Sequence, residues 1–206
     1  MPVNWTRILI MKIRRILIPS VALAAVAIPL LSHAVEEPPF KSLKKDGNFE
    51  LREYANIPIA SAPMEGMGKR DKSFNNLFKY ISGANEGNQK IPMTAPVLME
   101  AGPADAAGAE KGKMSFVIPA AVAKAGAPKP TGEGMAVGAI QASQIATLRF
   151  KGWTSEESRK KAEEDLANLI KANKLTPIGK PFFAFFDPPW TLEMFRRNEV
   201  WQRVEK

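Results

Sequence analysis

Short stretches of the chain either alternate apolar and polar residues or are apolar throughout. Both patterns predict β-strands, because successive side chains of a strand point to opposite faces of a sheet. The expected strands are residues 49–55, 58–64, 95–100, 113–118, 135–141, 144–150, 181–186 and 199–204.

Two longer segments instead place apolar residues at the spacing of one helix face. The first helix is expected over residues 71–82, and its apolar positions are Phe74, Leu77, Phe78 and Ile81. The second is expected to open at residues 154–155, where Thr154 and Glu157 have the spacing of a capping box. Its expected buried stripe is Ala162, Leu166, Leu169 and Ile170.

The order strand, strand, helix, strand, strand occurs twice, over about residues 49–118 and 135–204. This order predicts an α+β fold in which two main helices cover one pseudo-symmetric antiparallel sheet that curls toward a distorted barrel. A single domain is expected over residues 49–206, preceded by a polar tether at 35–48. Residues 119–134, rich in alanine, proline, glycine and lysine, are expected to link the two halves.

The first 34 residues have the pattern of a secretory signal. Basic residues without an acid precede an apolar run at 16–31 and a short end at 32–34, which predicts cleavage after Ala34 and a periplasmic protein. An uncleaved anchor is the alternative, but the run is shorter than the roughly 20 residues of a spanning helix. Arg14 and Arg15 leave twin-arginine export as a second route. We expect a monomer that touches a membrane only through an uncleaved leader.

Charge and missing residue types limit the possible chemistry. Without the four basic residues of the leader, 25 lysines and arginines face 21 acids, so the mature domain is about +4. This mild excess, without a basic and aromatic stripe, does not indicate a nucleic-acid partner. The chain has no cysteine, and its one histidine, His33, lies in the leader. Nucleophiles and zinc sites that depend on these residues are therefore excluded, whereas lysine or carboxylate catalysis stays open.

Two segments far apart in the sequence have a distinctive composition. Residues 80–97 read Tyr-Ile-Ser-Gly-Ala-Asn-Glu-Gly-Asn-Gln-Lys-Ile-Pro-Met-Thr-Ala-Pro-Val, and residues 186–190 read Phe-Asp-Pro-Pro-Trp before Arg-Arg-Asn-Glu-Val-Trp at 196–201. Together they resemble the signature of the SOUL haem-binding family, and the likeness extends over about residues 49–204. The resemblance implies a pseudo-symmetric α+β barrel that is also similar to the effector-binding domains of some transcription regulators.

The resemblance further implies that haem or another tetrapyrrole is held without a covalent bond against the first helix. The residues it implies are Phe74, Leu77, Phe78 and Lys79 on that helix and Trp190, Met194, Arg196 and Arg197 in the second segment. The apolar side chains would contact the macrocycle, while Lys79 and one arginine would pair with its carboxylates. The alternative role for an arginine of this pair is to hold Glu199 inside the protein.

The chain departs from the family at positions that matter for iron. Glu53 stands where one branch uses an axial histidine, and Asp71 and Thr191 stand where a haem-binding relative has basic groups. An iron ligand would have to be methionine, tyrosine or lysine. The candidates for it are Met93, Met194, Tyr54 and Tyr80.

The leading hypothesis is an exported domain that binds haem or a related tetrapyrrole reversibly, for carriage or buffering. The alternatives are a binding module for another flat or amphipathic small molecule, a haem-processing factor that releases iron, and a structural or protein-partner role.

Overall fold

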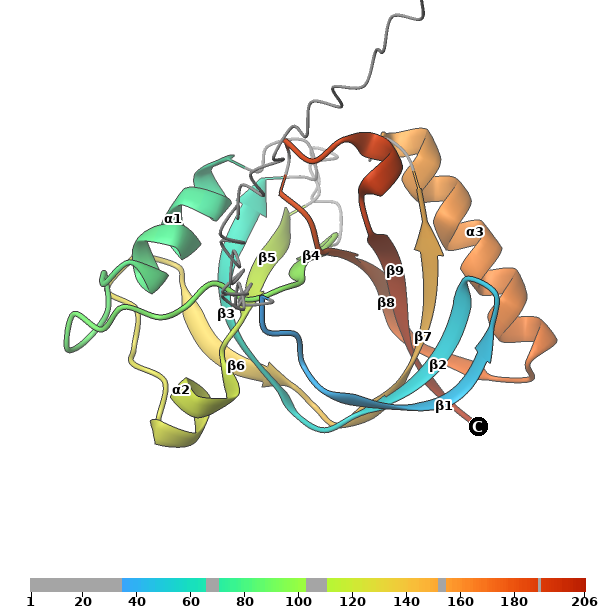
Figure 1. Cartoon of the computed structure of the whole chain (residues 1–206), viewed down its shortest axis with the longest axis horizontal. Helices are drawn as coiled ribbons and strands as arrows, with labels where there is room; N and C mark the ends of the chain where they lie inside the picture. Colours follow the sequence, from blue (N-terminus) through green and yellow to red (C-terminus); the bar gives the residue numbers. More distant parts are fainter. Residues whose placement is uncertain (1–34, 66–70, 103–110, 152–154, 189) are drawn as a thin grey trace, which may run out of the picture. The chain divides into compact units, whose positions relative to one another are not determined.

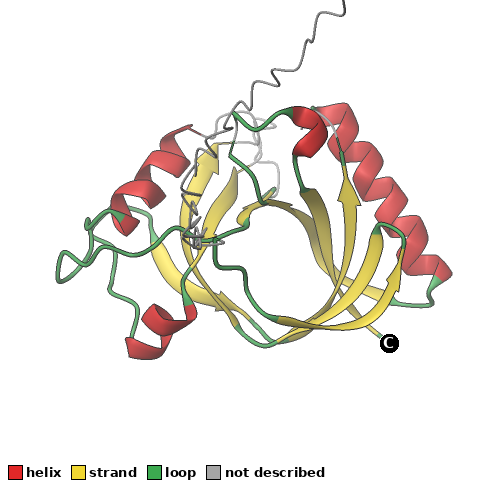
Figure 2. Cartoon of the chain, in the orientation of Figure 1, coloured by secondary structure: helices red, strands yellow, loops and turns green. Residues whose placement is uncertain are grey.

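The computed structural model describes residues 35–65, 71–102, 111–151, 155–188 and 190–206. In these residues nine strands form one antiparallel sheet, and three α-helices accompany it (Figures 1 and 2). The predicted leader lies outside the described residues. Within them, no helix is both long and apolar enough to cross a membrane.

The secondary structure follows the predicted order with two additions. The strands are β1 (Phe40–Asp46), β2 (Phe49–Tyr54), β3 (Ile57–Glu65), β4 (Val97–Glu100), β5 (Lys111–Val117), β6 (Ala136–Ile140), β7 (Ser143–Phe150), β8 (Thr176–Phe185) and β9 (Asn198–Glu205). The helices are α1 (Asp71–Ile81), α2 (Ala120–Ala125) and α3 (Glu156–Ala172), with a 3₁₀ turn η1 (Glu193–Phe195).

The strand order shows the internal symmetry. It runs β1-β2-β7-β9-β8-β4-β5-β3-β6. Without β1, the series β2-β7-β9-β8 from one end matches β6-β3-β5-β4 from the other, so each strand of one half has a counterpart in the other half. The predicted α+β class with a pseudo-symmetric antiparallel sheet is confirmed. The sheet is not closed by hydrogen bonds, because β1 and β6 are its edges.

A corner between β2 and β3 explains how the sheet curls. Tyr54 pairs with Ser143 on one side of the corner, and Ile57 pairs with Ile140 on the other, so the register continues across the bend. At the bend the Asn56 side-chain oxygen accepts a hydrogen bond from the Ala142 amide at 2.8 Å. The two ribbons therefore bend together, and Figure 1 shows the resulting trough-like sheet.

The helices pack on the outer face of this curved sheet (Figure 1). Helix α1 contacts β3 and β5, and α3 contacts β7, β8 and β9. Each helix covers its own apolar cluster, and a third cluster occupies the inner face. The neighbours Ala146 and Ile145 illustrate the division, since Ala146 packs under α3 and Ile145 belongs to the inner cluster.

The structure differs from the sequence-based expectations in four places. Strand β1 forms within the predicted tether, and α2 forms within the predicted linker. Strand β8 begins at Thr176, earlier than predicted. The described cap of α3 is Ser155, whose side chain accepts a hydrogen bond from the Ser158 amide at 3.2 Å, and the predicted cap Thr154 lies outside the described residues.

Candidate functional site

Helix α1 leaves two aromatic side chains exposed. Phe74 is 37% exposed and Phe78 is 52% exposed. Their rings are nearly parallel, with centroids 6.3 Å apart, and the Phe74 ring meets the buried Phe116 ring edge-on at 5.3 Å. The exposed pair is therefore anchored to the core through Phe74. Lys79, the residue after Phe78, is exposed to solvent.

The aromatic pair is exposed because polar residues occupy part of the buried face of α1. The Ser73 hydroxyl donates to the Pro63 carbonyl at 2.7 Å, and the Tyr80 hydroxyl donates to the Pro128 carbonyl at 2.9 Å. The buried side chains of α1 are Ser73, Leu77, Tyr80 and Ile81. Leu77 is thus fully buried in this structure, and its predicted contact with a ligand stays a prediction.

The loop between β8 and β9 carries a second group of exposed apolar side chains. The exposed residues are Trp190, Leu192, Met194 and Phe195, and Trp190 is 82% exposed. The base of the loop is held closed, because the Asp187 carboxylate accepts from the Arg197 amide at 2.5 Å. Within it, Arg196 Nε donates to the Thr191 carbonyl at 2.7 Å. We call residues 190–195 the apolar loop tip.

Figure 1 shows the start of α1 and the β8–β9 loop at the same end of the sheet. No ring contact joins Trp190 to Phe74 or Phe78 among the residues described. The described structure therefore shows the two predicted groups as separate exposed surfaces, one on α1 and one on the β8–β9 loop.

Arg197 is already engaged within the protein. Its guanidinium pairs with Glu199 at 2.9 Å and with Glu37 at 2.9 Å, and it stacks on the Phe186 ring at 3.6 Å from the centroid. Of the two roles weighed for this arginine, the structure shows the internal one, holding Glu199.

Glu199 also belongs to a buried ion network on the inner face, and its partners there were not predicted from the sequence. Arg52 Nη1 donates to Glu199 at 2.7 Å, Arg52 also pairs with Glu50 at 2.8 Å, and the Trp201 indole donates to Glu199 at 2.7 Å. Burial alone would raise the pKa of Glu199, but the hydrogen bond and charge of Arg52 outweigh it and hold that pKa below its ordinary value. The sequence signal for this network was the alternation of polar Glu50 and Arg52 with apolar residues in the predicted strand. The structure buries both polar side chains.

The candidate iron ligands differ in accessibility. Tyr80 is buried with its hydroxyl bonded to a carbonyl, and Tyr54 is buried beside Arg52 and Trp201. Burial raises the pKa of Tyr54 to about 12 and also raises the pKa of Tyr80, which disfavours a phenolate ligand. Met93 and Met194 are exposed. Within the described residues no group of three or more histidine, cysteine or acidic side chains is placed to bind a metal.

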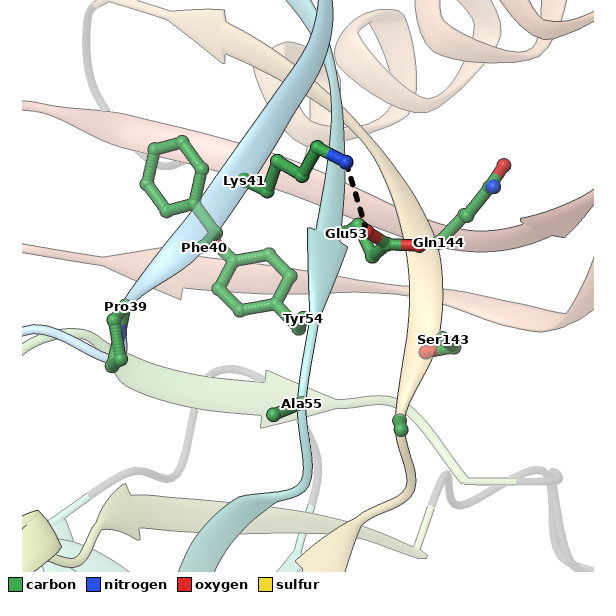
Figure 3. Close-up of a pocket in the computed structure, with 9 residues that line it drawn as sticks. Pro39, Phe40, Lys41, Glu53, Tyr54, Ala55, Ser143 and Gln144 are labelled. Carbon is green, nitrogen blue, oxygen red and sulfur yellow. Dashed lines mark ion pairs between the residues drawn. The ribbon is translucent and has the colours of Figure 1, made fainter.

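A hollow is lined by residues of β1, β2 and β7 (Figure 3). Phe40 and Tyr54 form one wall, with ring centroids 5.4 Å apart, and Lys41 and Glu53 lie at the rim. The Lys41–Glu53 pair is 4.0 Å apart and exposed, so it contributes little stability. Glu53 therefore lies on β2, whereas the exposed aromatic pair lies on α1, which packs against β3 and β5.

Comparison of the sequence with known proteins identifies a family and relatives of the chain. The sequence matches the family described as SOUL heme-binding protein over residues 35–203. It is 26% identical to heme-binding protein 2 of Homo sapiens over 179 residues, covering 82% of this chain and 86% of that protein. It is 27% identical to heme-binding protein 1 of Mus musculus over 157 residues, covering 75% of this chain and 78% of that protein.

Solved structures support the fold. The EcmrR C-terminal domain superimposes with a TM-score of 0.58 at 15% identity, covering 77% of this chain and 97% of that one. A hydrolase from Listeria innocua superimposes with a TM-score of 0.55 at 10% identity, covering 79% and 94%. At these identities the likeness shows the architecture alone. Because the family match spans nearly all the described residues, this chain belongs to the SOUL haem-binding protein family.

Proposed function

We propose that the protein binds haem or a related tetrapyrrole reversibly and without a covalent bond, for carriage or buffering. The macrocycle lies against the exposed aromatic pair of α1, and the apolar loop tip covers it. The observation that carries this proposal is the exposure of Phe74 and Phe78 on a helix whose other face is packed into the core. The names of the mammalian relatives support the same ligand class.

Apolar contact supplies the affinity. Each 100 Å² of apolar surface removed from water contributes about 2.5 kcal/mol before the costs of association. The Phe74 ring is held by Phe116 and the Phe78 ring lies against Phe74, so the pair presents such surface with little loss of side-chain freedom. Exposed Trp190 and Met194 of the apolar loop tip offer further apolar surface.

The carboxylates of the ligand need cations nearby. Lys79 is exposed and lies one residue beyond Phe78, about 100° further round the helix, within reach of a ligand on the aromatic pair. Arg197 is committed to Glu37 and Glu199, so Lys79 is the principal partner on this surface.

Binding of this kind does not depend on an iron ligand. The mature chain has no histidine or cysteine, and both tyrosines are buried. We therefore expect iron-free protoporphyrin to bind nearly as well as haemin. A clear preference for haemin with a changed visible spectrum would instead place an exposed methionine, such as Met194, on the iron.

The test is a titration of the purified protein with haemin and with protoporphyrin, followed by absorbance. Phe78→Ala and Trp190→Ala should each weaken both ligands about fivefold to tenfold, because each removes a large apolar contact. Leu43→Ala on β1 is the matched control, since Leu43 is 38% exposed and distant from α1, and it should leave both affinities unchanged. If all three variants bind both ligands as tightly as the unchanged protein does, the site is refuted. If the unchanged protein shows no saturable binding, the function is refuted.

We also propose that the protein acts after export and cleavage following Ala34. The family match begins at residue 35, and Glu36 is joined to the domain, because its carbonyl accepts a hydrogen bond from the Ala95 amide at 2.9 Å. The intact mass of the protein recovered from the periplasm should correspond to a chain that starts at Val35. A mass that includes the leader would contradict the proposal.

A further inference from the structure

The inner face of the sheet holds a cleft that the haem site does not use. Its volume is about 150 Å³, and its apolar floor is formed by Ile59 of β3, Leu98 of β4 and Phe182 of β8. These strands come from both halves, so the cleft lies between them. Helix α1 packs on the opposite face of β3, against Ala60 and Ala62, which separates the cleft from the aromatic pair.

Cations dominate the rim of this cleft. They are Lys113 of β5, Lys180 of β8 and Arg203 of β9, against one acid, Glu100. Glu100 pairs with Lys113 at 2.9 Å. Within the described parts of the chain no ion pair neutralises Lys180 or Arg203, and the Lys180 ammonium has only a long contact of 3.5 Å with the Gly102 carbonyl. The rim therefore carries an excess of positive charge.

An irregularity in β8 positions two of these cations. The register with β9 shifts between Ile178 and Phe182, and Gly179 within the shift has a φ of 71°. A Cβ at Gly179 would lie 3.3 Å from an Arg203 guanidinium nitrogen, so the glycine leaves room for the arginine to cross it. Gln202 fixes the bulge by donating to the Ile178 carbonyl at 2.9 Å. Bulges commonly redirect side chains beside binding sites.

The hydroxyl pair of buried Ser115 and half-buried Ser61 supplies a hydrogen-bond donor. Ser115 lines the cleft and is 2% exposed, and its oxygen lies 2.7 Å from the Ser61 oxygen. Two hydroxyls have two protons, but their mutual hydrogen bond uses one of them. When Ser61 donates, the Ser115 proton is available to an acceptor in the cleft.

We propose that this cleft binds a small organic anion, a carboxylate with a compact apolar body such as one aromatic ring. The apolar part contacts Ile59, Leu98 and Phe182, and the carboxylate pairs with Lys180 and Arg203. The cleft is well below the roughly 300 Å³ at which pockets begin to enclose drug-sized ligands, so a macrocycle does not fit. The site is independent of the proposed haem site.

The experiment is a heteronuclear NMR titration of the full chain with three probes of one shape, benzoate, benzyl alcohol and benzylamine. Benzoate should saturate and shift the amide signals of Ile59, Leu98 and Ser115, and benzylamine should not. The variant Lys180→Gln with Arg203→Gln should weaken benzoate binding about tenfold, because both ionic hydrogen bonds to the carboxylate are lost. Arg149→Gln with Lys160→Gln is the matched control, since both side chains are exposed elsewhere, and should leave it unchanged.

Three results would overturn the proposal. They are binding of benzylamine as tight as that of benzoate, shifts confined to the Phe74 and Phe78 region, and an unchanged benzoate affinity in the double variant. Thermal unfolding of each variant establishes that it remains folded. Haemin affinity measured on the same variants separates this cleft from the haem site, because we expect it to stay unchanged.

Discussion

Replacing Arg52 by methionine tests the buried network of the inner face. The Arg52 and Glu199 side chains are 6% and 2% exposed, so their ion pair is almost fully shielded from water. Removing one partner of a buried pair costs about 3 to 5 kcal/mol, because the other charge loses its compensation. Glu199 keeps its bonds from Arg197 at 2.9 Å and Trp201 at 2.7 Å, which favours the lower end. We expect Arg52→Met to lower the free energy of unfolding by about 3 kcal/mol.

The assay is urea unfolding followed by far-ultraviolet circular dichroism. With a denaturant slope of about 2 kcal/mol per molar urea, the midpoint should fall by about 1.5 M. The double variant Arg52→Met with Glu199→Gln is the control, because it removes the unpaired charge as well as its partner. It should be more stable than the sum of the two single effects predicts, by about 1 to 2 kcal/mol. A loss below about 1 kcal/mol in Arg52→Met, or strict additivity, would refute the reasoning.

Three further predictions follow from the same structure. Because the pKa of Glu199 is lowered from 4.5, its stabilising effect is complete above about pH 4.5 and is lost as pH falls through the folded pKa; Glu199→Gln should reduce the acid sensitivity of the unfolding midpoint. Burial raises the pKa of Tyr54 from 10.0 to about 12, so the contribution of Tyr54 to the free energy of unfolding is complete below pH 10 and is lost as pH rises toward 12. In a pH titration, phenolate absorbance should therefore appear at higher pH in the native protein than in the unfolded chain. Titration of either tyrosine near pH 10 in the native state would contradict this. Ser155→Ala removes the cap of α3 and should lower the free energy of unfolding by about 1 kcal/mol in urea, whereas Ser155→Asp should restore it.

The strands and long helices could be predicted because their patterns are local. Seven-residue β1 could not, because all its side chains are exposed and it carries three lysines, so no apolar alternation marks it. It forms because the edge of β2 offers unpaired backbone groups, as in the pairing of Phe40 with Tyr54. An edge strand of this kind depends on its neighbour and has no signature of its own.

The orientation of α1 was predicted only in part. Apolarity placed Phe74 and Phe78 on the expected stripe, but the core side of the helix includes Ser73 and Tyr80. These two are buried because carbonyls at Pro63 and Pro128 accept their hydroxyl protons, and Pro128 is distant in the sequence. Hydropathy could not identify such partners, so it could not show that the phenyl rings face solvent.

The contacts on the inner face of the sheet could not be predicted from the sequence for the same reason. The contact between Arg52 and Glu199 joins residues 147 positions apart. Only the strand order, which brings β2 and β9 to either side of β7, makes that contact possible. The cleft with the cationic rim likewise combines residues of β3, β4, β5, β8 and β9, and no single segment of the sequence contains enough of them to reveal it.

The pseudo-symmetry of the fold supplies an internal control for the proposed haem surface. Helices α1 and α3 occupy corresponding positions in the two halves and cover the same kind of sheet face. Along α3 no large apolar side chain is exposed, although it is the longer helix, whereas α1 exposes two phenylalanines. Packing of a helix on this sheet face therefore does not require exposed aromatic side chains, because α3 packs there and has none. The exposed aromatic pair of α1 is therefore free for contact with a partner outside the chain, which is the role that the proposed haem site gives it.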